Sequence, residues 1–309
     1  MASKIAVQPL KPIDLSEKKH FTFDDIPDLT GKVAIVTGGN TGIGYFTCRE
    51  LARQSAHVFV LSRNIERGQT AVEKIKSETG NQNVEFLQLD LKKLRSVKEC
   101  AEKFLARNLP LHILINNAGI TTKEFSLTDD GIQEEFGLLT KLLLPKIKAS
   151  QPARIVNLSS HAHRAFASEG GFDFEKLNDP NAMDSMPRYG LSKLANILFT
   201  NELNKRYLEG EQIYTNSLHP GLIDTNLIKK NDFALPEHYL VGLISPEDGA
   251  ITSLYCATSP EIEEKNYRAK YFEPFGKECE LPPYAEDDDL AKQLWEFTEH
   301  LINEKLTQN

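Results

Sequence analysis

The stretch "KVAIVTGGNTGIG", residues 32–44, joins a short apolar run to a glycine-rich turn. Residues 32–37 are apolar on both faces, which is typical of a strand covered by helices on either side. Gly38, Gly42 and Gly44 follow at the point where a first helix would begin. Glycine lets a backbone approach a ligand closely, and the first amides of a helix favour a phosphate. The stretch therefore predicts the first unit of a nucleotide-binding α/β sheet.

Short β-branched runs alternate with helical stretches along most of the remaining chain. This alternation indicates βαβ units and hence an α/β fold with a doubly wound parallel sheet of the Rossmann type. We expect a single domain over residues 29–309, preceded by an N-terminal extension over residues 1–28. Further helices are expected to begin at Ser245 and at the acidic run 286–289. The expected strands span residues 32–37, 57–62, 84–89, 112–116, 154–158 and 213–218.

Composition narrows the class of protein. The 309 residues are 40% hydrophobic and 26% charged, with a formal net charge of −8. This balance argues against nucleic acid as a partner, because nucleic-acid binding requires clustered cations. No apolar run approaches the ~18 residues of a membrane span, and the polar N-terminus carries no secretory signal. The four cysteines are scattered without paired spacing, which indicates reduced thiols and a cytoplasmic protein.

Two further motifs follow the glycine turn. "NNAG" at 116–119 ends the fourth expected strand, and "YGLSK" at 189–193 lies on an expected helix. With the Gly-x-x-x-Gly-x-Gly spacing at 38–44, they resemble the short-chain dehydrogenase/reductase family, from about Asp28 to beyond Thr225. "LTDDG", "PARIVNLSS" and "YGLSKLANILFT" resemble its retinol-dehydrogenase-like branch. The resemblance implies an oxidoreductase that interconverts an alcohol and a ketone or aldehyde, with an apolar small molecule as substrate.

The end of the second expected strand bears on the choice of cofactor. An acidic residue there would bind the adenosine ribose and repel a 2′-phosphate. Ser62 stands at that position and Arg63 follows. A guanidinium matches a phosphate in charge and geometry, so we expect NADP(H) in preference to NAD(H). The alternative is that Arg63 is an ordinary surface residue. By the resemblance, the cofactor also contacts Gly38, Asn40, Thr41, Gly42, Ile43, Gly44, Asp90, Leu91, Asn117, Ala118, Gly119, Tyr189, Lys193, Pro220, Gly221 and Thr225.

Tyr189 and Lys193 stand four residues apart, so they share one face of a helix. An unperturbed tyrosine has a pKa of about 10. A neighbouring ammonium and the charge of an oxidised nicotinamide are expected to lower it. Tyr189 would then be the general acid for carbonyl reduction and the general base for the reverse. The resemblance also assigns Lys193 to the nicotinamide ribose and aligns Ser160 with the substrate-orienting serine, with Ser159 as the alternative.

His161 and His163 suggest a metal site at first sight. No third ligand of suitable spacing accompanies them. We therefore expect no metal, and interpret the two histidines as part of a polar loop over the active site.

A segment of the family is absent after Gly137. Relatives in this branch carry a further stretch before Leu-Leu-Thr, whereas this chain continues directly with Leu138. The missing stretch includes the asparagine that the family uses as its fourth catalytic residue. A gap of about seven residues is ~1.9 helical turns, so the helix keeps its apolar face and loses ~10 Å of length. The expected apolar stripe comprises Ile132, Phe136, Leu139, Leu143 and Ile147.

The gap leaves alternatives open. Thr140 or an ordered water are conceivable replacements for the asparagine, and loss of one relay member is expected to cost between about ten- and a thousand-fold in rate. The alternative function is a nucleotide-binding protein of the same fold with impaired or no catalysis. An erroneous gene sequence or a splice variant would also explain the gap. By resemblance the shortened helix belongs to the subunit interface, which weighs against a homodimer.

Overall fold

The computed structural model describes residues 20–119, 137–167, 171–177, 179, 181–223 and 243–307. They contain an eight-stranded sheet of order β3-β2-β1-β4-β5-β6-β7-β8. All neighbouring strands are parallel except β7 and β8, which are antiparallel. The predicted doubly wound parallel sheet is confirmed, and each predicted strand is present to within one residue at either end. The strands are β1 (Val33–Thr37), β2 (His57–Ser62), β3 (Val84–Gln88), β4 (Ile113–Asn116), β5 (Ala153–Leu158), β6 (Ile213–Leu218), β7 (Tyr271–Glu273) and β8 (Lys277–Glu278).

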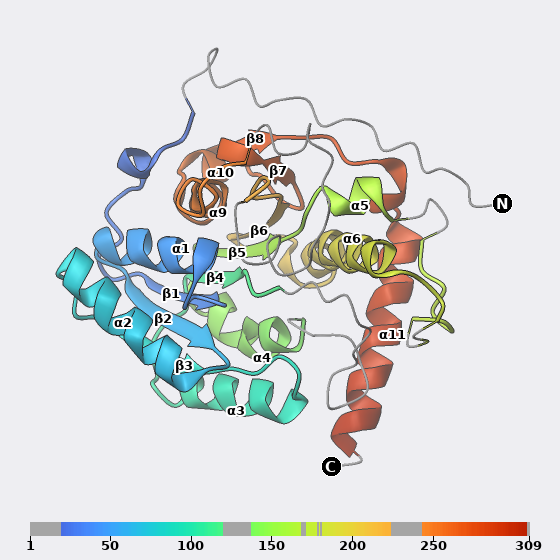
Figure 1. The fold of residues 1–309 in the computed structure, drawn as a ribbon, viewed down its shortest axis with the longest axis horizontal. Helices are drawn as coiled ribbons and strands as arrows, with labels where there is room; N and C mark the ends of the chain where they lie inside the picture. The colour runs from blue at the N-terminus through green and yellow to red at the C-terminus, as the bar shows by residue number, and fades with distance from the viewer. Residues whose placement is uncertain are drawn as a thin grey trace.

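Helices cover both faces of the sheet, and Figure 1 shows α1 and α9 above the strands and α3 and α4 below them. One face carries α1 (Gly42–Arg53), α2 (Ile65–Thr79) and α9 (Ala250–Thr258). The other carries α3 (Leu94–Leu105), α4 (Gly137–Lys148) and α6 (Ser185–Leu203), and α11 (Asp288–Thr307) packs against α6. Among the described residues, no helix is both long and apolar enough to cross a membrane. The shorter helices are η1 (Phe23–Asp25), α5 (Ala162–Ala165), η2 (Asn204–Leu208), α10 (Glu261–Glu264), η3 (Pro274–Gly276) and η4 (Pro283–Ala285).

The two cores explain why the strands are apolar on both faces. Successive side chains of a strand point to opposite faces of the sheet. In β1, Ala34 and Val36 pack beneath α1 and α9, whereas Val33 and Ile35 belong to the core beneath α3 and α4. All four are buried. A period-two pattern would have left one face polar, so the continuous apolar run is what a strand between two helical layers requires.

Helix α4 spans 12 residues, or about 18 Å at ~1.5 Å per residue. Leu139, Leu143 and Ile147 are fully buried against the sheet, as the sequence predicts. Ile132 and Phe136 lie outside the described residues. Strand β5 pairs in parallel with β4, so the chain returns to the start of the sheet despite the missing segment.

The two C-terminal helix starts were predicted with different success. Helix α11 begins as expected, because Asp287 Oδ1 accepts a hydrogen bond from the Leu290 amide at 2.9 Å. The expected start at Ser245 was wrong by several residues. Ser245 Oγ does accept from the Asp248 amide at 3.0 Å, but it caps a separate turn, and α9 begins only at Ala250. A capping residue marks the first turn of backbone it satisfies, and that turn need not continue as α-helix.

A buried polar network joins the central strands to the helices below them. Asn116 Nδ2 on β4 donates to Thr140 Oγ1 on α4 at 3.0 Å and to Asn157 Oδ1 on β5 at 2.7 Å. Asn157 Nδ2 donates in turn to Thr200 Oγ1 on α6 at 2.9 Å. All four residues are buried. Buried polar groups are costly unless paired, so this network fixes α4 and α6 against β4 and β5.

Asn157 is the residue on which this network depends most. Replacing Asn157 by alanine removes two buried hydrogen bonds and leaves the Asn116 amide and the Thr200 hydroxyl short of a partner. We expect the free energy of unfolding to fall by about 2–4 kcal/mol. Urea denaturation measures the change, with Gln82→Ala as a control because its amide makes only an exposed local bond. A loss as small as that of the control would contradict a stabilising role for the network.

Candidate active site

The glycine-rich turn after β1 is tight on its inner side and open on its outer side. Gly38 and Gly42 have φ values of +65° and +56°, in the left-handed region that favours glycine. A methyl group on Gly44 would lie 2.3 Å from the Gly38 carbonyl oxygen, so turn and helix approach too closely for any side chain. A methyl group on Gly42 would meet nothing within 4 Å. The open side offers backbone to a ligand as bulky as a pyrophosphate.

The N-terminus of α1 lacks a side-chain cap. Thr41 occupies the N-cap position in extended conformation and its hydroxyl accepts no hydrogen bond there. Helix α2, by contrast, is capped by Asn64 Oδ1, which accepts from the Arg67 amide at 2.8 Å. The first amides of any helix have no partner within it. Those of Gly42, Ile43 and their neighbours in α1 can therefore bind phosphate oxygens, which the helix dipole also favours.

Thr37, the last residue of β1, fixes the segment after β4 beside this turn. Its Oγ1 accepts hydrogen bonds from the amides of Asn117 at 3.0 Å and Ala118 at 2.9 Å. Asn117 Nδ2 in turn donates a hydrogen bond to the Thr37 carbonyl at 2.8 Å. A methyl group on Gly38 would consequently lie 3.1 Å from Ala118 Cα. Thr37 was not predicted as a site residue; the signal was a hydroxyl at the end of an otherwise apolar strand.

Ser160, Tyr189 and Lys193 converge at the carboxyl end of β5. The Tyr189 hydroxyl is hydrogen-bonded to the Ser160 side chain. Lys193 Nζ lies 5.5 Å from the centroid of the Tyr189 ring and 3.5 Å from the Leu158 carbonyl oxygen. A methyl group on Gly119 would be 3.2 Å from Lys193 Nζ. Two chain segments that are distant in sequence therefore meet at the ammonium group of Lys193.

The two candidate serines have different surroundings. Ser159 is buried, and its hydroxyl donates to the Lys193 carbonyl at 2.7 Å, which ties α6 to β5. Ser160 is the serine that contacts Tyr189. Asn196, which was not predicted, donates to the Leu158 carbonyl at 2.7 Å. Its position one helical turn after the lysine, on the same face, was the available signal.

Burial controls the proton affinity of Tyr189. Burial raises the pKa of Tyr189 above its usual 10, and the hydrogen bond with Ser160 opposes this rise without cancelling it. The expected lowering of this pKa includes the charge of an oxidised nicotinamide and stays a prediction, because without that charge the removal of the phenolate from water costs more than the neighbouring groups return.

Gly190 allows the segment after Ser160 to pack directly on α6. A methyl group on Gly190 would lie 2.7 Å from the Ala162 carbonyl oxygen and 2.8 Å from the Ala167 amide nitrogen. Helix α5 therefore rests against α6 at the residue next to Tyr189.

The histidines near Ser160 are engaged in hydrogen bonds and ring contacts. His161 Nε2 lies 2.7 Å from Glu273 Oε1 on β7, and its ring centroid is 4.5 Å from that of His219. Burial raises the pKa of Glu273, but hydrogen bonds from His161 and Cys279 and nearby positive charge bring it to about 2. His163 Nδ1 lies 2.6 Å from the Ser160 carbonyl oxygen, and because a carbonyl can only accept, Nδ1 carries the proton. Within the described part of the chain, no group of three potential ligands could hold a metal ion.

The residues expected at the adenosine end follow β2 and β3. Ser62 Oγ donates to the Asn64 carbonyl at 3.2 Å, and Arg63 is exposed. Gln88 Nε2 donates to the Arg63 carbonyl at 3.3 Å, which links the turn after β2 to the end of β3. Asp90 Oδ1 accepts from the Lys92 amide at 3.1 Å, and the adjacent Leu91 is partly buried. Like the glycine turn, these residues lie at the carboxyl edge of the sheet.

The segment expected at the nicotinamide end follows β6. Gly221, next to Pro220, has φ +103°, and a methyl group on it would lie 2.7 Å from Ile244 Cδ1. Ile223 pairs with Ile244 in a parallel bridge, which holds this segment beside the chain leading to α9. Thr225 lies outside the described residues. The order of the strands puts β4 and β5 between this segment and the glycine turn.

The fold, the glycine turn and the Ser160–Tyr189–Lys193 cluster define an enzyme of the nucleotide-binding α/β class. Residues 32–170 match the short chain dehydrogenase family. Mouse retinol dehydrogenase 12 is 40% identical to this chain, over 89% of this chain and 87% of its own length. An uncharacterized oxidoreductase of Schizosaccharomyces pombe is 41% identical, over 97% of this chain and 93% of its own. A crystal structure of an uncharacterized protein from Mycobacterium Paratuberculosis has a TM-score of 0.71 and 30% identity, covering 92% of this chain and 98% of that one.

These similarities establish the family. The chain belongs to the short-chain dehydrogenases, in their retinol-dehydrogenase-like branch, and is an oxidoreductase. The resemblance that its motifs predict is thereby confirmed. Members of the family use a nicotinamide nucleotide, NAD(H) or NADP(H).

The buried histidine next to Ser160 makes the fold sensitive to acid. Burial lowers the pKa of His163 from its usual 6.5 to about 4. Between these values the unfolded chain binds more protons than the folded one, so the free energy of unfolding falls as the pH falls. We expect His163 to account for a loss on the order of 2–3 kcal/mol between pH 7 and pH 4.5.

Urea denaturation at the two pH values tests this. His163→Asn keeps a donor near the Nδ1 position and cannot titrate, so its loss between pH 7 and 4.5 should be smaller than that of the wild type by the same amount. His300→Asn removes an exposed histidine on α11 and serves as the control. Equal losses in wild type and His163→Asn would contradict the assignment.

Proposed function

We propose that the chain is an NADP(H)-dependent oxidoreductase that interconverts an alcohol and a ketone or aldehyde. The observation that carries the proposal is the hydrogen bond between Tyr189 and Ser160 beside Lys193. It joins a proton donor, a hydroxyl able to orient a substrate oxygen, and a cation at one edge of the sheet. The relatives named retinol dehydrogenase support an apolar alcohol or carbonyl compound as substrate.

The residues at this edge fit a dinucleotide. The open side of Gly42 and the uncapped amides of α1 suit a pyrophosphate. Gly119 has no side chain to separate a bound ribose from Lys193. Arg63 is exposed after β2, where a guanidinium can pair with a 2′-phosphate, and no carboxylate stands at Ser62 to repel one. These features favour NADP(H) over NAD(H).

The protein's own groups would manage the proton. When bound, the nicotinamide donates or accepts the hydride at the carbonyl carbon. Ser160 would donate a hydrogen bond to the substrate oxygen, and Tyr189 would give that oxygen its proton during reduction. The raised pKa of Tyr189 keeps the hydroxyl protonated at neutral pH, which is the form that reduction requires. Oxidation requires the phenolate, which the ammonium of Lys193 would help to stabilise.

A second function has one observation in its favour, the absence of the family's asparagine after Gly137. A nucleotide-binding protein with impaired or no catalysis would tolerate that absence. Thr140, a conceivable replacement, accepts its hydrogen bond from Asn116 in the core network and so gives no support to a role at Lys193. The cluster of Ser160, Tyr189 and Lys193 favours the catalytic function.

Replacing Arg63 by alanine tests the choice of cofactor. A charge-assisted hydrogen bond to phosphate is typically worth ~1.5–3 kcal/mol, so the Kd for NADPH should rise about tenfold or more. The Kd for NADH should change by less than about twofold, because NADH lacks the 2′-phosphate. Nucleotide fluorescence titration measures both, with Arg107→Ala as control, since Arg107 pairs with Glu85 near the amino end of β3, whereas Arg63 follows the carboxyl end of β2. A parallel weakening of both nucleotides would rule out recognition of the 2′-phosphate.

Replacing Tyr189 by phenylalanine separates catalysis from binding. Loss of the proton donor should lower kcat for carbonyl reduction by about 10²–10⁴-fold, while NADPH still binds. Turnover of a panel of apolar aldehydes and ketones is followed by NADPH absorbance, and Tyr207→Phe provides a control remote from Ser160. Wild-type protein that binds NADPH but reduces none of the panel faster than Tyr189→Phe would instead support the second function.

A further inference from the structure

The two ends of the proposed nucleotide site belong to strands that do not touch. The glycine turn follows β1, and residues 220–221 follow β6, with β4 and β5 between them. Three strand spacings of ~4.8 Å separate β1 from β6 by about 14 Å. A dinucleotide that contacts both ends binds well only if their separation is fixed in advance. The paired strands fix the strand ends, and contacts outside the sheet can fix the segment after β6 against the helix after the glycine turn.

Residues 244–249 connect the two ends. On one side, Ile244 packs against Gly221, pairs with Ile223, and donates its amide hydrogen to the Leu222 carbonyl at 2.9 Å. On the other side, a methyl group on Gly249 would lie 2.5 Å from Ile223 Cδ1 and 3.3 Å from Ile43 Cγ1. Ile43 stands in the first turn of α1. The segment therefore lies between the end of β6 and the helix that follows the glycine turn.

The turn within this segment is internally braced. Ser245 Oγ donates to Asp248 Oδ2 at 2.8 Å and accepts from the Asp248 amide at 3.0 Å. The Gly249 amide donates to the Ser245 carbonyl at 2.9 Å. These hydrogen bonds hold the turn together, so a contact at one of its residues positions the whole turn.

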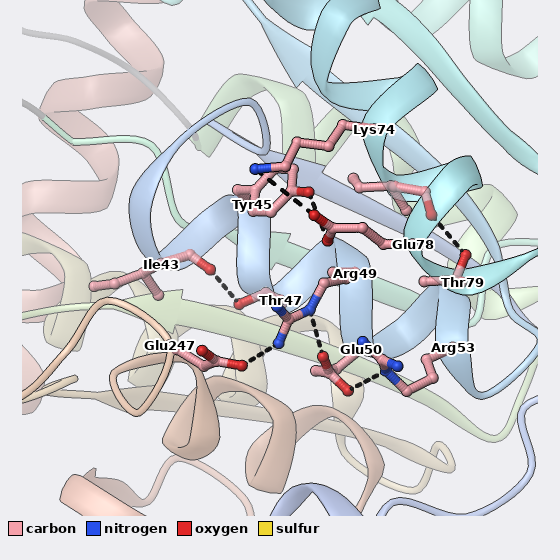
Figure 2. Close-up of polar contacts among 11 residues, drawn as sticks. Ile43, Tyr45, Thr47, Arg49, Glu50, Arg53, Lys74, Glu78, Thr79 and Glu247 are labelled. Atoms are coloured by element: carbon pink, nitrogen blue, oxygen red, sulfur yellow. Dashed lines mark hydrogen bonds and ion pairs between the residues drawn. The ribbon is translucent and has the colours of Figure 1, made fainter.

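An ion pair ties the turn to α1. Figure 2 shows Arg49 of α1 between Glu50 of the same helix and Glu247 of the turn. Arg49 Nη2 donates to Glu247 Oε1, and its Nε donates to Glu50 Oε1 at 2.6 Å. Glu50 is only 3% exposed and also accepts from Arg53 Nε at 3.0 Å. The guanidinium of Arg49 further lies 4.7 Å from the centroid of the Phe46 ring.

The side chains of Arg49 and Glu247 differ in how deeply they are buried. The side chain of Arg49 is 13% exposed and is held by Glu50 and Phe46 before it reaches the turn, whereas that of Glu247 is 42% exposed. Arg49 is therefore pre-organised, and Glu247 is the part of the pair that can be changed without leaving a buried charge. A removal of Arg49 would also deprive Glu50 of one of its two cationic partners.

We propose that Arg49 and Glu247 are positioning residues that fix the separation between the phosphate-binding turn and the end of β6. The proposal rests on the proposed function, because it concerns the same nucleotide site. In this proposal the two side chains act through the turn and α1 and not by contact with the nucleotide. We call this ion pair the clamp. It lets residues 220–221 and the first turn of α1 bind opposite ends of one dinucleotide. A ligand that reaches only one end gains no affinity from it.

The test compares a whole dinucleotide with half of one. Glu247→Gln in the full chain keeps the size of the side chain and removes its charge. We expect the Kd for NADPH to rise about two- to fivefold, the effect of losing a partly exposed ion pair. The Kd for adenosine 2′,5′-bisphosphate, which lacks the nicotinamide half, should stay unchanged within error. Glu99→Gln, which breaks the exposed Arg95–Glu99 pair on α3, should alter neither.

A second variant tests whether Arg49 and Glu247 act through the same contact. Arg49→Gln should weaken NADPH at least as much as Glu247→Gln, and adding Glu247→Gln to it should cause no further loss, because the two residues act through one contact. Equal weakening of NADPH and of the bisphosphate, additive effects of the two changes, or no effect of either would overturn the clamp. If the wild-type chain binds neither NADPH nor NADH, the proposed function fails and the clamp fails with it. If the wild-type chain binds NADPH and Glu247→Gln leaves the ratio of the Kd for NADPH to the Kd for the bisphosphate unchanged, only the clamp is refuted.

Discussion

The hydroxyl of Thr37 accepts hydrogen bonds from two consecutive amides, those of Asn117 and Ala118, and the geometry of the whole site depends on this contact. It fixes the segment after β4 against the glycine turn after β1, at the point where the strand order reverses direction. Gly119 then lies beside the ammonium of Lys193, which belongs to α6 on the far side of β5. The backbone of the glycine turn and the cluster of Ser160, Tyr189 and Lys193 are thus linked through one buried hydroxyl, and the segment after β4 could not shift without breaking two hydrogen bonds from its amides to Thr37 Oγ1.

Burial favours the neutral forms of two groups at the site. It raises the pKa of Tyr189, because the phenolate would lose water, and so favours the protonated form. It also lowers the pKa of His219 well below 6.5 and keeps that ring neutral beside His161. Charged groups lie beside both: Lys193 Nζ is 5.5 Å from the centroid of the Tyr189 ring, and Glu273, whose pKa is brought to about 2, lies 2.7 Å from His161. If Tyr189 is the general acid, as we propose, its protonated form suits carbonyl reduction, whereas oxidation would require the phenolate and positive charge from Lys193 and the cofactor.

The sequence predicted the features that follow from periodicity and spacing. Both-face apolar runs located the six long strands, and glycine positions located the turn after β1. The sequence did not predict the roles of Thr37, Asn196 and Gly190. These roles depend on contacts across the sheet or between helices, and the pattern of residues along the chain does not show which residues come into contact. Ser245 was recognised as a cap, yet the turn it caps does not continue as α-helix, since a local hydrogen bond cannot reveal how many turns follow. The short strands β7 and β8 were not predicted either, because they form by pairing at the edge of the sheet.

The resemblance implies that one helix combines two roles, and the gap after Gly137 separates them. The residues that hold α4 to the sheet, Leu139, Leu143 and Thr140, all lie after the gap, and Asn116 anchors them through a buried hydrogen bond. The family's asparagine belongs to the part that is missing. The contacts that hold α4 to the sheet are therefore kept, whereas a proton relay at Lys193 of the kind that the resemblance implies would lack one member. Because a protonated Tyr189 can deliver one proton without prior exchange, this loss should slow the restoration of the enzyme between turnovers more than the reduction step itself.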